Sequence, residues 1–164
     1  ASTSHLAMEF FKPMAGITPT HVPYKTAVSA LTDLSSGRVD VMFENLGTAA
    51  PYLVSKRVRA LAFGGAVRSK VAPDVPTFAE SGFPEYNVYS WNGIYAPPGT
   101  PKAIIDRLNH AFVVASQSAE VRQRVADSFS ANIKVGTPQQ FEELVRSETS
   151  RISKAIASKT LVLE

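Results

Sequence analysis

Apolar residues recur every three or four positions in several stretches of this chain, the spacing that places side chains on one face of an α-helix. Leu6, Phe10 and Met14 form such a stripe in the first stretch. A later stripe comprises Ile104, Ile105, Leu108 and Phe112. The pattern predicts helices at about residues 4–14, 27–35, 48–55, 101–112, 118–126 and 138–156, with one short helix near 78–81. Each helix is expected to bury its apolar stripe.

Residues that satisfy the free backbone groups of a helix mark several of these ends. Ser4 is expected to cap the first helix, Pro13 to end it, and Gly16 to lie just beyond. Thr137 and Gln140 have the spacing of a capping box, in which each side chain accepts a hydrogen bond from the other residue's backbone. The last long helix is therefore expected to begin at this box.

Short apolar runs between the helices predict β-strands. They lie at about residues 20–24, 39–43, 58–63 and 132–135, and an extended stretch precedes Pro97 and Pro98. Strands that alternate with helices imply right-handed crossovers and a parallel sheet, so the predicted fold class is α/β. In such sheets, ligands bind beyond the carboxyl ends of the strands.

Polar side chains follow two of the predicted strands at that edge. Tyr24 ends the first strand and Thr26 comes just after it, and Glu44 and Asn45 follow the second strand. Tyr24 is expected either to donate its hydroxyl to a carboxylate or to support the turn. Asn45 is suited both to holding the turn and to binding a ligand. Glu44 would repel an anion unless water or a ligand amine lies between them, which keeps amino-acid-like ligands under consideration.

The start of the first helix is a second candidate position for an anion. Ser2, Thr3 and Ser4 offer hydroxyls beside the free backbone N–H groups of the first turn, which attract negative charge. The alternative is simple N-capping. His5 either reaches the ligand or packs on the same turn.

Composition narrows the class of protein. The 164 residues allow one domain or slightly more, with 45% hydrophobic and 19% charged residues. No run reaches the ~20 apolar residues of a bilayer span, so membrane insertion is not expected. The net charge of +3 is spread along the chain, which favours small anions and not nucleic acid. The absence of cysteine excludes disulfides and cysteine nucleophiles.

An enzyme and the effector-sensing domain of a regulator are the alternatives to a binding protein. No G-x-S-x-G nucleophile turn occurs, and no helix-turn-helix is visible. His5 and Glu9 are four residues apart and suit a metal, but the H-E-x-x-H pattern is absent and no third ligand stands out. We therefore assign no catalytic residue, metal or cofactor.

Seven segments, in order, resemble the substrate receptors of tripartite tricarboxylate transporters, also called Bug or TctC-like proteins. They are "STSHLAMEFFKPMAGI", "HVPYK", "LSSGRVDVMFENL", "RALAFGGAVRS", "PDVPTFAESGF", "SWNGIYAPPGTP" and "EVRQRVA". Each segment alone is a weak signal, but the shared order covers nearly the whole chain. The resemblance implies a periplasmic receptor that closes two α/β domains of the type II periplasmic-binding-protein class over a small organic acid. It also implies that the acid, a mono- or dicarboxylate, passes to membrane permease subunits.

The same resemblance implies a domain organisation. Residues 1–90 correspond to the ligand-binding second lobe without its first strand, 91–100 to the hinge strand, and 101–164 to the part of the first lobe to which the chain returns. The turn at Ser2–Ser4 is similar to the receptors' carboxylate-binding loop. The sequence departs from the family at two positions: Thr26 stands where the family often has Gly, and Glu44 stands where it commonly has Asp. The ligand of this chain therefore need not be the family's usual one.

Overall fold

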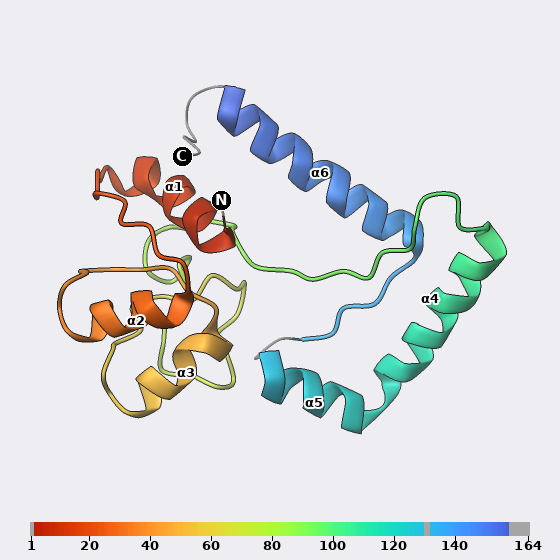
Figure 1. Cartoon of the computed structure of the whole chain (residues 1–164), viewed down its shortest axis with the longest axis horizontal. Helices are drawn as coiled ribbons and strands as arrows, with labels where there is room; N and C mark the ends of the chain where they lie inside the picture. The colour runs from red at the N-terminus through yellow and green to blue at the C-terminus, as the bar shows by residue number, and fades with distance from the viewer. Residues whose placement is uncertain (1, 130–131, 158–164) are drawn as a thin grey trace. The chain divides into compact units, whose positions relative to one another are not determined.

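The regular secondary structure is helical in the part of the chain that the computed structural model describes, residues 2–129 and 132–157 (Figure 1). The helices are α1 (Thr3–Ala15), α2 (Ala27–Ser35), α3 (Leu46–Val54), α4 (Lys102–Gln117), α5 (Ala119–Phe129) and α6 (Pro138–Ala157). Those described residues hold one isolated parallel bridge, Phe63 to Thr77, and no longer ladder.

The predicted parallel sheet is therefore not formed within the described chain. The bridge rests on two backbone hydrogen bonds, from Phe63 N–H to the Pro76 oxygen at 2.8 Å and from Phe78 N–H to the Phe63 oxygen at 3.1 Å. A strand satisfies its N–H and C=O groups only on a neighbouring strand, so an apolar run without such a neighbour stays irregular. The short helix predicted near 78–81 is instead a series of turns.

The chain divides into two compact units. The first contains residues 2–90 and therefore helices α1 to α3, and the second is Trp91–Ala155, with α4, α5 and most of α6.

An aromatic core holds the first unit together. Ala7 on α1 and the distant Tyr86 and Val88 are buried at its centre. The partly buried rings packed around them are Phe10, Phe11, Phe43, Phe78 and Phe83. Tyr86 donates its hydroxyl to the Ala7 carbonyl at 3.1 Å, which satisfies a polar group inside this core. Residues 83–88 are thereby fixed against α1.

The ends of α1 differ from the sequence prediction. Ser2, and not Ser4, is the N-cap, because its hydroxyl accepts from the His5 backbone N–H at 3.2 Å. Pro13 lies inside the last turn, and the helix ends at Gly16, whose φ of 64° is the left-handed conformation that glycine adopts readily. Pro13 was therefore wrongly predicted to end the helix.

The bounds predicted for α2 and the capping box predicted for α6 are confirmed, but Val28 on the α2 stripe is 59% exposed, so only part of that stripe is buried. α2 spans Ala27–Ser35 as expected. Gln140 N–H donates to the Thr137 hydroxyl at 3.2 Å, and Thr137 N–H donates to the Gln140 side-chain oxygen at 2.9 Å. These reciprocal bonds form the capping box.

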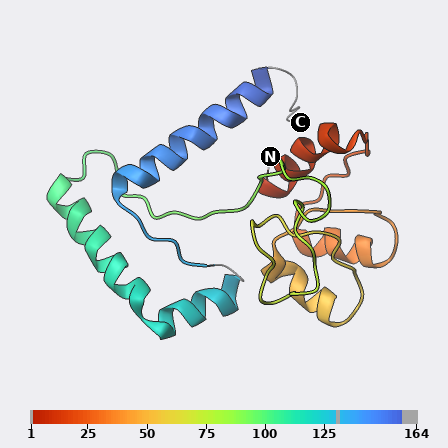
Figure 2. The same cartoon turned by 180° about the vertical axis from the view of Figure 1, so that it is seen from behind.

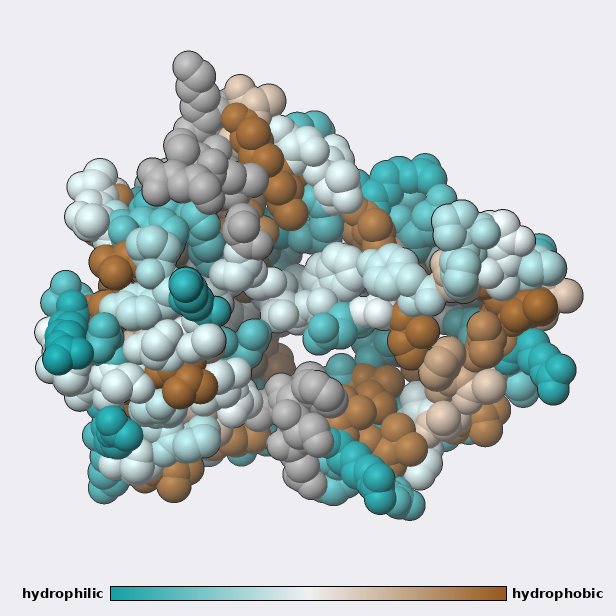
Figure 3. Space-filling view, in the orientation of Figure 1, coloured by the Kyte–Doolittle hydropathy of each residue, from teal (hydrophilic) through white to brown (hydrophobic). Residues whose placement is uncertain are grey.

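The second unit leaves one helix face open. Ile104, Leu108 and Phe112 on α4 are 50%, 44% and 44% exposed, so the prediction that this stripe is buried is wrong for the chain as described. Apolar side chains are visible at the surface over α4 in the space-filling view (Figure 3). We call these three residues the α4 stripe.

Candidate ligand-binding site

The first turn of α1 presents hydroxyls and backbone N–H groups. Ser2 and Thr3 are exposed and Ser4 is half-buried. The Ser2 hydroxyl oxygen accepts the capping bond, so its O–H can still donate a hydrogen bond. The positive end of the helix dipole lies at this turn and favours an anion there.

His5 lies one residue further along this turn and stacks on His21. The ring centroids are 4.4 Å apart at an interplanar angle of 22°. His5 Nε2 is also 3.7 Å from Glu9 Oε1, and Glu9 contacts Lys12 through its carboxylate. Burial and the nearby His21 lower the pKa of His5, while Glu9 opposes that shift. His5 is therefore neutral at pH 7 and available as a hydrogen-bonding group.

Thr26 begins α2 by capping it. Its hydroxyl accepts from the Ser29 backbone N–H at 3.2 Å, and the Ser29 hydroxyl donates to the Thr26 carbonyl at 2.8 Å. Both residues are exposed, so the start of α2 faces outward. The hydroxyl that replaces the family's frequent glycine thus has a structural use.

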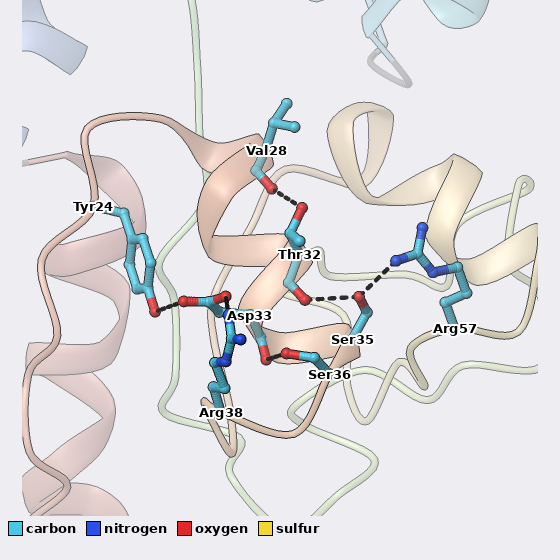
Figure 4. Close-up of polar contacts among 8 residues, drawn as sticks. All are labelled: Tyr24, Val28, Thr32, Asp33, Ser35, Ser36, Arg38 and Arg57. Atoms are coloured by element: carbon cyan, nitrogen blue, oxygen red, sulfur yellow. Dashed lines mark hydrogen bonds and ion pairs between the residues drawn. The ribbon is translucent and has the colours of Figure 1, made fainter.

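Tyr24, in the turn before α2, is directed along the helix toward Asp33 (Figure 4). Its hydroxyl donates to Asp33 Oδ2 at 2.9 Å, and Arg38 Nη1 donates to Asp33 Oδ1 at 3.0 Å. The bond to Asp33 raises the pKa of Tyr24, and the same bond, followed by that from Arg38, lowers the pKa of Asp33. The phenol proton is therefore committed to Asp33 in this conformation.

Glu44 and Asn45 meet at the start of α3. Glu44 Oε1 accepts from the Asn45 backbone N–H at 2.8 Å, and Asn45 is the N-cap residue. In the described structure the exposed Asn45 side chain makes no capping hydrogen bond. Its amide is thus placed at a helix start without being used to hold that helix.

The three helices of the first unit begin on the same side of that unit (Figures 1 and 2). The predicted residues at these starts are Ser2, Thr3, Ser4, His5, Thr26, Glu44 and Asn45. Tyr24 is the exception, because its hydroxyl lies beside Asp33, two turns into α2. At the opposite end of the same helices, Arg57 donates to the Ser35 hydroxyl at 2.9 Å and links the ends of α2 and α3 (Figure 4).

Sequence reasoning missed three residues of this region: Asp33, Arg38 and His21. Each of them contacts a partner that no sequence motif links to it. Tyr24 and Asp33, for example, are nine residues apart. Alternation of apolar and polar positions gave no signal for these contacts. Only the fold brings them together.

Two classes of site find no support among residues 2–129 and 132–157. Within those residues, His, Asp and Glu side chains do not gather in threes in a way that would hold a metal ion. In the same part of the chain, no helix has the length and apolar character needed to span a membrane.

Comparison with known proteins identifies the family. A model of the tripartite tricarboxylate transporter family receptor matches residues 1–161. The chain belongs to this receptor family. A curated relative, the UPF0065 protein in the tcbD-tcbE intergenic region of Pseudomonas sp. strain P51, is 34% identical over 158 residues, which is 96% of this chain and 47% of that protein. This chain thus spans about half the length of this relative.

Solved structures of the receptor class extend the comparison. Rpa4515 of R. palustris with adipate gives a TM-score of 0.82 at 36% identity, covering 97% of this chain and 52% of that one. MatC from Rhodopseudomonas palustris with bound malate gives a TM-score of 0.72 at 34% identity, covering 92% of this chain and 52% of that one. The periplasmic binding protein BugD gives a TM-score of 0.77 at 26% identity, covering 96% of this chain and 52% of that one. The receptor chain therefore shares its fold with half of a periplasmic binding protein.

Proposed function

We propose that this chain is the ligand-binding lobe, with part of the partner lobe, of a periplasmic receptor for a small organic carboxylate. The observation that carries the proposal is the set of three helix starts on one side of the first unit, each with a polar residue. Membership of the receptor family and the adipate and malate in two solved neighbours support it.

The chemistry of the helix starts suits a carboxylate. Backbone N–H groups at a helix N-terminus donate to an anion, and the dipole adds about 0.3–1 kcal/mol at an exposed site. We assign ligand contacts to Ser2, Thr3, Ser4, His5, Thr26, Glu44 and Asn45. Tyr24 lies in the turn before Thr26, and its hydroxyl is bonded to Asp33. Water molecules would bridge many of these contacts.

Glu44 restricts which carboxylates fit. Its carboxylate sits at the start of α3 and accepts from Asn45 N–H, so an anionic group placed next to it would be repelled. A ligand amine or hydroxyl next to Glu44 would be attracted instead. The proposed ligands are mono- or dicarboxylates, including those with an amino group.

The lobe organisation is also a proposal. Residues 1–90 would form the second lobe, 91–100 the hinge, and 101–164 the returning part of the first lobe. The segments at 20–24, 39–43 and 58–63 would join a parallel sheet once a neighbouring strand from the rest of the receptor is present. Closure about the hinge would add contacts from both lobes and favour the closed state. Delivery to permease subunits of the transporter would follow, with no cofactor and no turnover.

Calorimetry tests the ligand class. The receptor that contains this sequence is titrated with adipate, malate, an amino acid such as aspartate, and a sugar such as glucose. We expect a carboxylate to bind reversibly and to be recovered unchanged, as followed by proton NMR. Tight sugar binding without a response to any carboxylate would refute the proposal, and turnover of the bound acid would favour an enzyme.

A further inference from the structure

Asp33 is the centre of a polar cluster that brackets α2. One carboxylate oxygen accepts from Tyr24, in the turn before the helix, at 2.9 Å. The other accepts from Arg38, in the turn after it, at 3.0 Å. Figure 4 shows the Tyr24 ring and the Arg38 side chain both reaching the Asp33 carboxylate. We call Tyr24, Asp33 and Arg38 the α2 brace.

The brace is better shielded at its centre than at its rim. The Asp33 side chain is 25% exposed, whereas that of Arg38 is 74% exposed. Arg38 is also held through its backbone, which donates to the Asp33 carbonyl at 2.9 Å. A charge-assisted bond in a partly shielded position is stronger than a neutral one in water. The Tyr24 contact is therefore the one most able to restrain the turn before α2.

The direction of Tyr24 separates two possible roles. A phenol that recognised a carboxylate would present its proton to the ligand, but this proton is given to Asp33. The hydroxyl also lies two turns into α2, whereas the ligand contacts proposed above lie at the helix start, where Thr26 caps the helix.

We propose that Asp33 is a positioning residue which, by holding Tyr24, fixes the turn at residues 23–26 so that the start of α2 is ordered to receive a ligand. The binding role in this inference rests on the proposed function, whereas the ordering of the turn does not depend on it. Tyr24 then acts through its anchorage and not through contact with the carboxylate.

The titration behaviour of the two groups agrees with this arrangement. The pKa of Tyr24 is raised by its bond to Asp33, and the pKa of Asp33 is lowered by its bonds to Tyr24 and Arg38. In Asp33→Asn the Tyr24 phenol loses its charged partner, so one of the five tyrosines should ionise at lower pH. An ultraviolet-monitored alkaline titration measures that change, which a general loss of packing would not produce selectively.

Hydrogen exchange on the full chain tests the ordering of the turn without any ligand. The amides of Ser29 and Ala30 donate to Thr26 at the start of α2, at 3.2 and 3.3 Å. Tyr24→Phe and Asp33→Asn should each speed their exchange by about tenfold, the equivalent of about 1.4 kcal/mol. The double variant should do no more than Asp33→Asn alone, because Asp33→Asn already removes the charged partner of Tyr24, together with that of Arg38.

Thr32→Val is the matched control. Its hydroxyl donates to the Val28 carbonyl at 2.8 Å on an exposed face of the same helix, so one hydrogen bond of α2 is lost while the brace stays intact. Exchange at Ser29 and Ala30 should then match the parent chain. Equal acceleration in the control and in the brace variants would overturn the proposal, as would unchanged exchange in both brace variants.

A binding arm separates this inference from the proposed function. With adipate and malate as probes, Tyr24→Phe and Asp33→Asn should weaken affinity by similar, non-additive factors. Weaker binding in Tyr24→Phe alone would show direct contact and overturn the inference. If the parent binds neither probe while the exchange pattern appears as expected, the positioning of the turn by Asp33 is supported and the proposed function fails.

Discussion

Thr26 and Asn45 occupy the same kind of position, the residue before a helix, but their side chains are used differently. The Thr26 hydroxyl accepts from Ser29 N–H and holds the start of α2. The Asn45 amide makes no such bond within the described structure, although Asn is among the best capping residues. A side chain that is placed at a helix start and not used there is free to serve a ligand. Replacing these two residues should therefore have different effects on stability.

Asn45→Ala should weaken carboxylate affinity in the complete receptor by about 1–3 kcal/mol, the usual cost of leaving a polar partner unpaired. Its melting temperature without ligand should change little, because no capping bond is lost. Thr26→Ala, by comparison, should lower stability by about 1 kcal/mol, because its cap on the Ser29 N–H is lost. Calorimetry and thermal unfolding measure the two quantities. Unchanged affinity together with lower stability in Asn45→Ala would make Asn45 a turn residue only.

The stacked pair of His5 and His21 gives the first unit a predictable pH dependence. The folded-state pKa of His5 is below its unfolded value of 6.5 because burial and His21 disfavour its cation. Its contribution to stability is therefore complete above pH 6.5 and is lost as pH falls below that value toward the folded pKa. Urea unfolding between pH 7.5 and about pH 5 should show this decline, and His5→Gln should flatten it.

His110→Gln supplies the comparison for that experiment, because His110 is an exposed residue on α4. It should retain the decline seen in the parent chain. An equally steep decline in His5→Gln would mean that other groups cause it.

At the scale of the elements, helices were predictable from the sequence and strands were not. α2 and the capping box of α6 depend on residues a few positions apart, so local spacing contains the information. A strand at 39–43 depends on a neighbour that the described residues do not supply. The helix starts of the candidate site were likewise visible as hydroxyl and amide residues, whereas the Tyr24–Asp33 contact needed the folded turn.

The start of α6 packs on a glycine in the extended segment 91–96, and this contact is specific enough to test. The Phe141 ring covers Gly93, with Cε2 2.7 Å from the point where a Cβ would stand, and Trp91 meets the same ring edge to face at 5.8 Å. Gly93→Ala should therefore destabilise the second unit by about 1–3 kcal/mol through overpacking.

Trp91 is the single tryptophan, so its fluorescence reports unfolding of the unit that carries the Gly93 contact. Phe141→Leu in the Gly93→Ala background should recover part of the loss, because a smaller side chain leaves room for the methyl group. Full stability in Gly93→Ala alone would mean that the Phe141 ring moves aside without cost.

At the scale of the whole molecule, we relate the exposure of the α4 stripe to the fraction of the solved receptor structures that this chain covers. A stripe of three large apolar residues, about half exposed, is what a helix shows when the surface it packs on is not included. The chain covers 52% of the structures it matches, and we propose that the other part of the first lobe covers this stripe.

The 164-residue chain expressed alone should therefore self-associate through the α4 stripe, as measured by light scattering. Leu108→Gln with Phe112→Gln should reduce the association. Val114→Gln, at a position that is 52% exposed but on a different face of α4, should leave it unchanged. A monomeric parent chain would contradict the lobe assignment.

The same reasoning predicts that this chain alone binds the receptor's carboxylate less well than the complete receptor does. A ligand held by one lobe lacks the contacts of the other lobe and the exclusion of water that closure brings. Affinity should fall at least tenfold, which corresponds to about 1.4 kcal/mol. Titration of both proteins with the acid that the complete receptor prefers gives the ratio directly. Adding Asn45→Ala to each protein serves as the internal check, since a site on the first unit should lose the same further factor in both. Undiminished affinity in a monomeric 164-residue chain would instead mean that the helix starts of α1 to α3 form a finished site without closure.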